Sequence, residues 1–217
     1  MRVGKRLEKI LDLVDHNLNA VADVGTDHGF LALRVIEEKN ANVVYATDIS
    51  KGSLDKAIDL ANKYNLKDRL ICIKTDGFKN MTVNLDVAVI AGMGGNEIVK
   101  ILRERPDSCV VKEYLLQPMQ DTEILREYLL TNGYSISYDE TVKDRDKFYS
   151  VIKCSYTGKA CKVNNQSIVI GITDKKNLGK DFKEFLEFNI NSLKAREKYL
   201  SEFDKKRLSI FESFFAK

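Results

Sequence analysis

Histidine, proline and tryptophan are scarce in this chain of 217 residues, which contains two histidines, two prolines and no tryptophan. Two prolines and 12 glycines are too few for a fibrous or linker-rich chain. The four cysteines are scattered and form no Cys-x-x-Cys pair: Cys72, Cys109, Cys154 and Cys161. Because a structural zinc site needs four closely spaced cysteine or histidine ligands, the sequence predicts no metal centre. We expect free thiols in a reducing compartment.

No apolar run approaches the roughly 20 residues that a membrane-spanning helix requires. The first residues, Met1–Arg6, lead directly into an amphipathic pattern, without the apolar segment and cleavage site of a secretion signal. We therefore expect a cytoplasmic protein with no membrane partner.

Charge is distributed unevenly along the chain. Residues 1–157 contain 22 basic and 24 acidic residues, a net charge of −2, and residues 158–217 contain 13 and 8, a net charge of +5. The two parts sum to the +3 of the whole chain. We interpret these ranges as a main domain and a basic C-terminal domain. A polyanionic partner would explain the basic tail, and so would a solvated helical face.

Hydrophobic periodicity predicts alternating strands and helices in the main domain. The predicted strands cover residues 20–25, 42–48, 69–74, 84–91, 113–117, 134–141 and 147–154. The predicted helices cover residues 4–16, 28–39, 50–65, 95–104 and 120–131, with Ser50 as the N-cap of the third. This alternation, closed by a hairpin, is typical of an α/β fold with a seven-stranded, mostly parallel sheet and helices on both faces.

The C-terminal domain has a helical pattern from Lys180 onward, with an expected break near Phe203–Asp204. The second helix after this break carries the apolar residues Leu208, Phe211, Phe214 and Phe215. Two such helices predict an antiparallel, coiled-coil-like hairpin. The segment Ser167–Ile172 before them is interpreted as a short strand or an extended link.

The first candidate for a ligand site is the turn Asp23-Val24-Gly25-Thr26-Asp27-His28-Gly29, directly after the first predicted strand. Ligands of open α/β sheets bind at the carboxyl ends of parallel strands, where a glycine such as Gly25 allows a close approach of the backbone. The spacing Gly-x-x-x-Gly differs from the Gly-x-Gly-x-x-Gly of dinucleotide-binding turns, which argues against a NAD-dependent enzyme. An acid such as Asp23 disfavours a pyrophosphate and suits a cationic ligand group.

Acids also end the next two predicted strands. Asp48, followed by Ile49, can accept hydrogen bonds from both hydroxyls of a ribose, and capping the next helix is its alternative role. Asp76 and Gly77 follow the third strand. Acids are depleted in buried strands, so three at the ends of three successive strands form an uncommon pattern. The pattern predicts an adenosyl ligand with a cationic amino-acid end, S-adenosylmethionine.

Glycines and an amide end the fourth and fifth predicted strands. Ala91-Gly92-Met93-Gly94 leaves room beside the backbone for a flat ligand or a flipped base, and a flexible turn is the simpler interpretation. Gln117 offers a donor and an acceptor together, which suits the edge of an adenine.

The order of these motifs resembles that of the bacterial TrmK family of tRNA methyltransferases. The similar segments are Asp23–Leu31, Ile90–Gly95, Leu115–Pro118, Leu125–Arg126 and Lys147–Tyr149, and Arg6–Leu7 and the closing helices also match the family outline. The resemblance therefore spans nearly the whole chain. It departs from the family at Met119, where an asparagine is usual, and at Lys51–Ser53, where a Gly-Pro pair is frequent.

The resemblance implies a Rossmann-like class I methyltransferase fold and methyl transfer from S-adenosylmethionine to N1 of adenine 22 in tRNA. It implies that the acid at position 76 reads the exocyclic amine of the cofactor's adenine. The expected cofactor-binding residues are Asp23, Gly25, Asp27, His28, Asp48, Ile49, Asp76, Gly77, Ala91, Gly92, Met93 and Gly94.

Catalysis is expected to depend on Asp27, His28 and Gln117. Adenine N1 has its own lone pair, so in-line attack needs no general base, and a carboxylate such as Asp27 can stabilise the cationic product. Helix capping by Asp27 and local packing of His28 are the structural alternatives. A flipped base needs an aromatic partner, for which Phe30, Phe78 and Tyr149 are candidates.

Three alternatives stay open at this point. The enzyme could methylate another acceptor, namely another RNA, a protein or a small molecule. The protein could be a non-enzymatic adaptor that retains a cofactor fold. It could also be an NAD-dependent enzyme, against which the missing Gly-x-Gly-x-x-Gly argues. The three acids argue against an adaptor, and the basic tail favours RNA. We expect a monomeric enzyme without a metal that binds tRNA through its tail.

Overall fold

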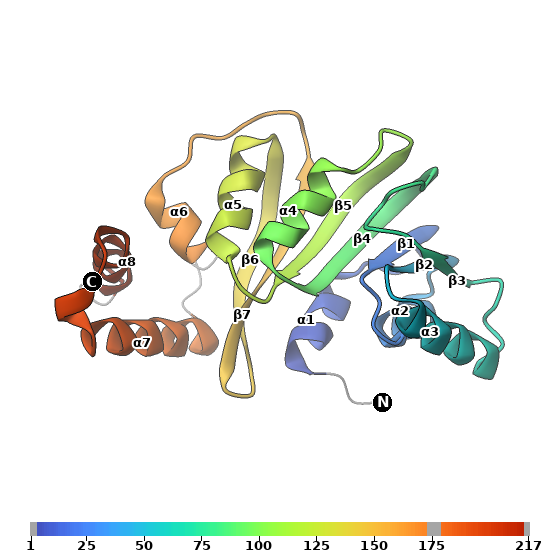
Figure 1. Cartoon of the computed structure of the whole chain (residues 1–217), viewed down its shortest axis with the longest axis horizontal. Helices are drawn as coiled ribbons and strands as arrows, with labels where there is room; N and C mark the ends of the chain where they lie inside the picture. Colours follow the sequence, from blue (N-terminus) through green and yellow to red (C-terminus); the bar gives the residue numbers. More distant parts are fainter. Residues whose placement is uncertain (1–3, 173–178, 215–217) are drawn as a thin grey trace.

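In the computed structural model, which describes residues 4–172 and 179–214, a seven-stranded sheet runs through the body of the molecule (Figure 1). The strands are β1 (Ala20–Val24), β2 (Val43–Asp48), β3 (Leu70–Lys74), β4 (Val83–Met93), β5 (Cys109–Pro118), β6 (Tyr134–Asp144) and β7 (Lys147–Tyr156). Their order is β3-β2-β1-β4-β5-β7-β6, and only β7 runs antiparallel to its neighbours, β5 and β6. The predicted α/β fold with a mostly parallel sheet is confirmed.

Helices cover both faces of the sheet. They are α1 (Lys5–Leu13), α2 (Phe30–Lys39), α3 (Lys51–Lys63), α4 (Gly95–Arg103) and α5 (Thr122–Thr131). Alternate side chains of β4 point to opposite faces: Val87 and Val89 join the core under α1, α2 and α3, whereas Ala88 and Ile90 join the core under α4 and α5. This two-sided burial explains why the parallel strands are continuously apolar.

Local signals fix several of the boundaries. The Ser50 side chain accepts a hydrogen bond from Ser53 N and caps α3, as the sequence predicts. Asn40 ends α2 in the left-handed region at φ 55°, a conformation that asparagine tolerates better than most residues. Strand β5 starts four residues earlier than predicted, because Cys109–Val111 continues the ladder with β4.

Three further helices follow the sheet: α6 (Asn165–Ile170), α7 (Lys180–Lys194) and α8 (Glu202–Glu212), with a 3₁₀ turn at Glu197–Tyr199. They form a separate apolar cluster that includes Ile170, Phe182 and Phe211. In Figure 1, α7 lies across the page and α8 is seen nearly end-on, so the two helices cross steeply instead of lying antiparallel. The predicted Phe215 lies outside the described residues.

Two further predictions for this region are wrong. Ser167–Ile172 lies mostly in helix α6, not in a strand, because Asn164 and Ser167 form a reciprocal capping box that starts a helix. The break between the last two helices falls at residues 195–201, before the predicted Phe203–Asp204, because the Ser201 side chain caps α8.

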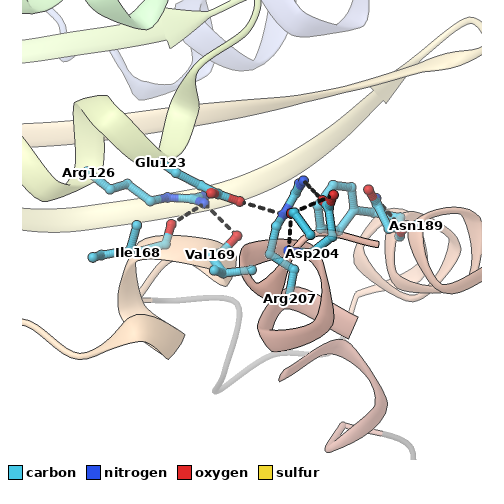
Figure 2. A network of polar contacts seen from close by, with 9 residues as sticks. Glu123, Arg126, Ile168, Val169, Asn189, Asp204 and Arg207 are labelled. Atoms are coloured by element: carbon cyan, nitrogen blue, oxygen red, sulfur yellow. Dashed lines mark hydrogen bonds and ion pairs between the residues drawn. The ribbon is translucent and has the colours of Figure 1, made fainter. Parts of the chain in front are cut away.

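Ion pairs and hydrogen bonds attach the C-terminal helices to the body (Figure 2). The buried guanidinium of Arg126 on α5 donates to the carbonyl oxygens of Ile168 and Val169, at 3.1 and 3.0 Å. Arg207 on α8 pairs with Glu123 on α5 at 2.9 Å. Among the described residues, no helix combines the length and the hydropathy needed to cross a membrane.

Candidate functional site

A cavity of about 90 Å³ opens at the carboxyl ends of β1 to β4. Six residues predicted from the sequence line it: Gly25, Asp48, Ile49, Asp76, Gly77 and Met93. The structure thus brings together the ends of four strands that are separated by up to 68 residues (93 − 25) in the sequence. Asp23, Asp27, His28, Ala91, Gly92 and Gly94 are not among the lining residues of this cavity.

Gly25 lies in the tight turn after β1, at φ 80°. Its amide and that of Thr26 both donate to Thr47 O on β2, at 2.8 and 2.9 Å, so the turn is fixed to the neighbouring strand. A Cβ atom at position 25 would collide with the Cε methyl of Met93. Position 25 therefore requires glycine for two reasons: the backbone is left-handed, and the Met93 methyl lies where a Cβ atom would be.

Asp23 is buried at the end of β1 and accepts a hydrogen bond from the Thr26 hydroxyl at 2.7 Å. Burial raises the pKa of its carboxyl from 3.8 to about 6. Hydrogen bonds from Thr26 and Ala32 N oppose this increase of the pKa, and the nearby Asp48 carboxylate adds to it. A buried acid with a raised pKa at a ligand-binding edge is a candidate functional group, because a cationic ligand would stabilise its charge.

Asp48 ends β2 at the cavity. One of its carboxylate oxygens, Oδ1, accepts from Ser50 N at 2.7 Å and so supports the start of α3. A carboxylate has about four acceptor sites, and this one bond leaves capacity for a ribose diol. The predicted and alternative roles of Asp48 are therefore compatible. Ile49 beside it is largely exposed, which suits contact with a ligand.

Asp76 follows β3 and belongs to an ion-pair cluster. Its Oδ2 lies 2.7 Å from Lys79 Nζ and 3.4 Å from Lys100 Nζ. The hydrogen bond from Lys79, the larger cause, and that from Lys100 lower the pKa of the carboxyl. Asp76 is therefore ionised at neutral pH. Exposed pairs of this kind add little stability, so the cluster mainly fixes the position of the carboxylate.

Asp27 and His28 form a surface chain with Lys56 of α3. His28 Nδ1 lies 2.8 Å from Asp27 Oδ2, and its Nε2 lies 2.9 Å from Lys56 Nζ. Because lysine can only donate, Nε2 is the acceptor and Nδ1 carries the proton in this arrangement. Asp27 is 80% exposed and is not the N-cap of α2, which is Gly29. The ring of His28 stacks on Phe30, in agreement with the local-packing alternative.

Gln117 ends β5 with a fully buried side chain. Its Oε1 accepts from Arg6 Nη1 at 2.5 Å, and its Nε2 donates to Pro118 O at 2.8 Å. Both ends of the amide are engaged within the protein in this geometry. Direct pairing of Gln117 with an adenine stays a prediction. In the structure, the amide also binds the Arg6 guanidinium.

The aromatic candidates have different environments. Phe78 is a core residue packed edge-on against Tyr114, so its ring does not face the cavity at the strand ends. Tyr149 on β7 is half-buried beside the Arg6 guanidinium and lines a second cavity, of about 410 Å³, between α5, the β6–β7 hairpin and the C-terminal helices. Phe30, at the start of α2 after the β1 turn, is half-buried as well and stacks on His28, so Phe30 and Tyr149 both remain candidates and Phe78 does not.

Some lining residues were not predicted from the sequence, among them Thr75, Glu97, Lys100 and Ile101. The last three occupy one face of the first turns of α4, directly after Gly94. Their helical spacing of three and four residues after a glycine turn is a signal that could have identified them. In the described part of the chain, no group of three or more histidine, cysteine or acidic side chains could hold a metal ion.

The strand order and the acids at the ends of β1, β2 and β3 define the class: a Rossmann-like, S-adenosylmethionine-dependent methyltransferase of class I. A family model described as a methyltransferase domain matches residues 3–152. A Mycoplasma pneumoniae protein provisionally named a tRNA methyltransferase is 31% identical over 195 residues, which cover 84% of this chain and 88% of that protein.

The tRNA (adenine(22)-N(1))-methyltransferase of Bacillus subtilis is 29% identical over 155 residues, which cover 70% of this chain and 64% of that enzyme. The structure of M. capricolum TrmK with S-adenosyl-homocysteine superposes with a TM-score of 0.86 at 21% identity, covering 99% of this chain and 98% of that one. The chain belongs to the methyltransferase family of the matching model; it is similar in sequence to tRNA methyltransferases and in fold to TrmK.

Proposed function

We propose that this protein transfers the methyl group of S-adenosylmethionine to N1 of adenine 22 in tRNA. The observation that carries the proposal is the rim of acids at the ends of three successive strands, Asp23, Asp48 and Asp76, around the Gly25 turn. The names of the relatives support tRNA as the acceptor and adenine 22 as the position.

The residues of the rim fit the cofactor chemically. Asp48 would accept from the ribose hydroxyls, Asp76 and Gly77 would face the adenine, and Asp23 would balance the ammonium of the amino-acid end. A cavity of about 90 Å³ is smaller than the roughly 300 Å³ or more of typical ligand sites. Met93, whose thioether is flexible and whose methyl lies over Gly25, is the side chain that would move to enlarge it.

The same rim offers further contacts. Ile49 would pack against the adenine, and the main chain of Ala91, Gly92 and Gly94 would approach the reacting end of the cofactor. Asp27 and His28 lie at the mouth of the turn and would contact the amino-acid end or the base. Each of these assignments is part of the proposal.

The cofactor, when bound, supplies an electrophilic methyl group on a sulfonium. Adenine N1 would form the new bond with its own lone pair while the sulfur–methyl bond breaks and the neutral thioether leaves, so no side chain has to remove a proton first. The chain contributes by holding the acceptor in line and by excluding water. The reaction also moves positive charge onto the base, and acids near the rim, with Asp27 as the proposed one, stabilise that charge.

The function is tested by incubating the purified protein with methyl-labelled S-adenosylmethionine and unmodified tRNA, followed by digestion of the tRNA to nucleosides. The expected result is label in 1-methyladenosine, which primer extension then maps to position 22. Cofactor binding without label in RNA would refute the tRNA acceptor and favour a different RNA, a protein or a small molecule.

The pH dependence of cofactor binding tests the role of Asp23. Its pKa is raised to about 6 in the folded protein, so the folded state retains this proton between pH 3.8 and about 6. Stability from this group is therefore present below pH 3.8 and is lost as the pH rises through about 6. A cationic ligand binds the ionised form. Calorimetry is expected to show affinity falling about tenfold per pH unit below about pH 6, because binding must then release the proton.

The matched control is Asp23→Asn, which keeps the size of the side chain and cannot ionise. We expect weaker cofactor binding for this variant and no change of its affinity between pH 5 and pH 7. A break near pH 6 that persisted in Asp23→Asn would assign the titration to another group.

We infer two functional parts in the chain, a methyltransferase domain at residues 1–157 and a tRNA-gripping domain at residues 158–217. Several basic side chains of the C-terminal part are exposed, including Arg196 and Lys198 between α7 and α8 and Lys206 on α8. Such cations release counterions when they contact phosphates. We further propose a monomer that acts on tRNA in the cytoplasm without a metal.

Replacement of Arg196, Lys198 and Lys206 by glutamine tests this grip. We expect weaker tRNA binding and a plot of log affinity against log salt that is less steep by about 0.7–0.9 for each lost phosphate contact. Filter binding over a salt series measures both quantities. Unchanged affinity and slope, with cofactor binding intact, would place the RNA elsewhere on the surface.

A further inference from the structure

The Arg6 side chain lies near the ends of β4 and β5, beside the proposed cofactor site. It lies in the first turn of α1, outside the alternating strands and helices of the fold, yet its guanidinium lies among three strand ends. Nη1 donates to Gln117 Oε1 at the end of β5, at 2.5 Å. The same Nη1 lies 3.9 Å from the place of a Cβ at Gly92, near the end of β4, and Cζ lies 5.8 Å from the centre of the Tyr149 ring on β7.

The guanidinium is held by neutral groups. Its side-chain partners are an amide oxygen and an aromatic ring. The Asp144 carboxylate accepts from the backbone amide of Arg6 at 3.4 Å, but none of the ion pairs among the described residues involves the Arg6 guanidinium. A half-buried cation is costly unless an anion balances it. The position is therefore suited to a negative group that arrives with a ligand.

Charge is separated across the rim. Three acids and one lysine line the cavity where the cationic cofactor is proposed to bind, namely Asp48, Asp76, Glu97 and Lys100, so acids are in excess there. Arg6 lies beyond them, at the ends of β4 and β5 and beside β7. A cation there would repel the methylated base, which is itself cationic, so the base is not its partner. The substrate's anion is the phosphate of its backbone.

We propose that Arg6 binds a phosphate of the nucleotide to be methylated and that Gln117 is the positioning residue that holds Arg6 in place. The inference rests on the proposed RNA substrate. The buried Gln117 amide, itself fixed by its bond to Pro118 O, aligns the guanidinium fork toward the strand ends. Tyr149 flanks the guanidinium and limits its rotation.

The test uses Arg6→Ala, Arg6→Lys and Gln117→Glu in the full-length protein. One charge-assisted hydrogen bond to phosphate is lost in Arg6→Ala, so kcat/KM for tRNA is expected to fall about 10- to 100-fold. The salt dependence of tRNA affinity should become less steep by about 0.7–0.9, the value of one phosphate contact. Arg6→Lys keeps the charge and is expected to restore the slope and part of the activity.

The variant Gln117→Glu tests whether Arg6 acts through its positive charge on a phosphate or only through its packing in the protein. The glutamate would pair with Arg6 and cancel its charge, so tRNA binding should fall as in Arg6→Ala although the packing is retained. Lys112→Ala is the control, because Lys112 is an exposed cation near the opposite end of β5, paired with Asp86. It should leave activity and salt slope unchanged.

Two further measurements keep the outcomes distinct. S-adenosyl-homocysteine affinity, measured by calorimetry, should be unchanged in the Arg6 variants. If the wild-type protein binds this cofactor product but methylates no tRNA, the proposed function is wrong. If the wild-type protein methylates tRNA, and Arg6→Ala has the same kcat/KM and salt slope, the inference about Arg6 is wrong.

Discussion

The substitution Asp139→Asn is expected to lower the free energy of unfolding by about 3 kcal/mol, the usual effect of breaking a buried ion pair. Asp139 on β6 is fully buried and binds Arg126 with both oxygens: Nε donates to Oδ2 at 2.9 Å, and Nη2 donates to Oδ1 at 2.8 Å. An asparagine of the same size leaves the guanidinium charge uncompensated in the interior.

The effect should extend to the C-terminal helices. The remaining nitrogen of Arg126, Nη1, donates to Ile168 O and Val169 O near the end of α6 (Figure 2). Gly171 packs so closely on the ion pair that a Cβ there would lie 2.5 Å from Asp139 Oδ2. A shift of Arg126 would therefore release α6, and hydrogen exchange of the α6 amides should become faster.

Urea unfolding measures the stability, and the double variant Arg126→Met with Asp139→Leu is the control. Replacing both charges by apolar groups removes the uncompensated charge, so the double variant should be more stable than Asp139→Asn. Its α6 should still exchange faster than in the wild type, because two carbonyl oxygens have lost their donor. A loss below about 1 kcal/mol for Asp139→Asn would show that water or another group compensates Arg126.

The substitution Asp48→Ala is expected to weaken S-adenosylmethionine binding by about 100- to 1,000-fold, because it would remove the two charge-assisted hydrogen bonds that we propose between this carboxylate and the ribose diol. The carboxylate lies at the cavity, and the hydrogen bond from Ser50 N to Oδ1 fixes its orientation. Titration calorimetry with S-adenosyl-homocysteine gives the affinity directly.

Asp48→Ala also removes a bond at the start of α3, so a control must separate folding from binding. Ser50→Ala removes the N-cap of the same helix and leaves the carboxylate in place. We expect it to cost about 1 kcal/mol of stability and to leave cofactor affinity within about twofold of wild type. An affinity for Asp48→Ala within threefold of wild type would mean that Asp48 only supports the helix.

Much of the sheet could be predicted because its signals are local. Buried parallel strands read as continuous apolar runs, and caps such as Ser50 mark the helices between them. The wrong predictions for the C-terminal helices arose because local propensity and the tertiary contacts disagree there. Ile168, Val169 and Ile170 favour a strand by propensity, but the capping box at Asn164 starts a helix, and Arg126, 42 residues earlier, binds its carbonyl oxygens.

The candidate site was predictable to a similar extent. Acids that follow apolar strands are visible in the sequence, and six of the predicted residues line one cavity. The environment of Gln117 was not predictable, because its partner Arg6 is 111 positions away. Nor could the sequence distinguish Phe78, a core residue, from Tyr149 at the second cavity.

The sequence by itself determined the strand–helix alternation, the acids at the strand ends and the family, since periodicity, caps and motif order are properties of neighbouring residues. The tertiary structure alone decided which side chains meet. It placed Arg6 against Gln117, inserted Arg126 between Asp139 and α6, and buried Asp23 enough to raise its pKa. These outcomes depend on burial and on contacts between distant segments, which close packing sets only when the whole chain folds.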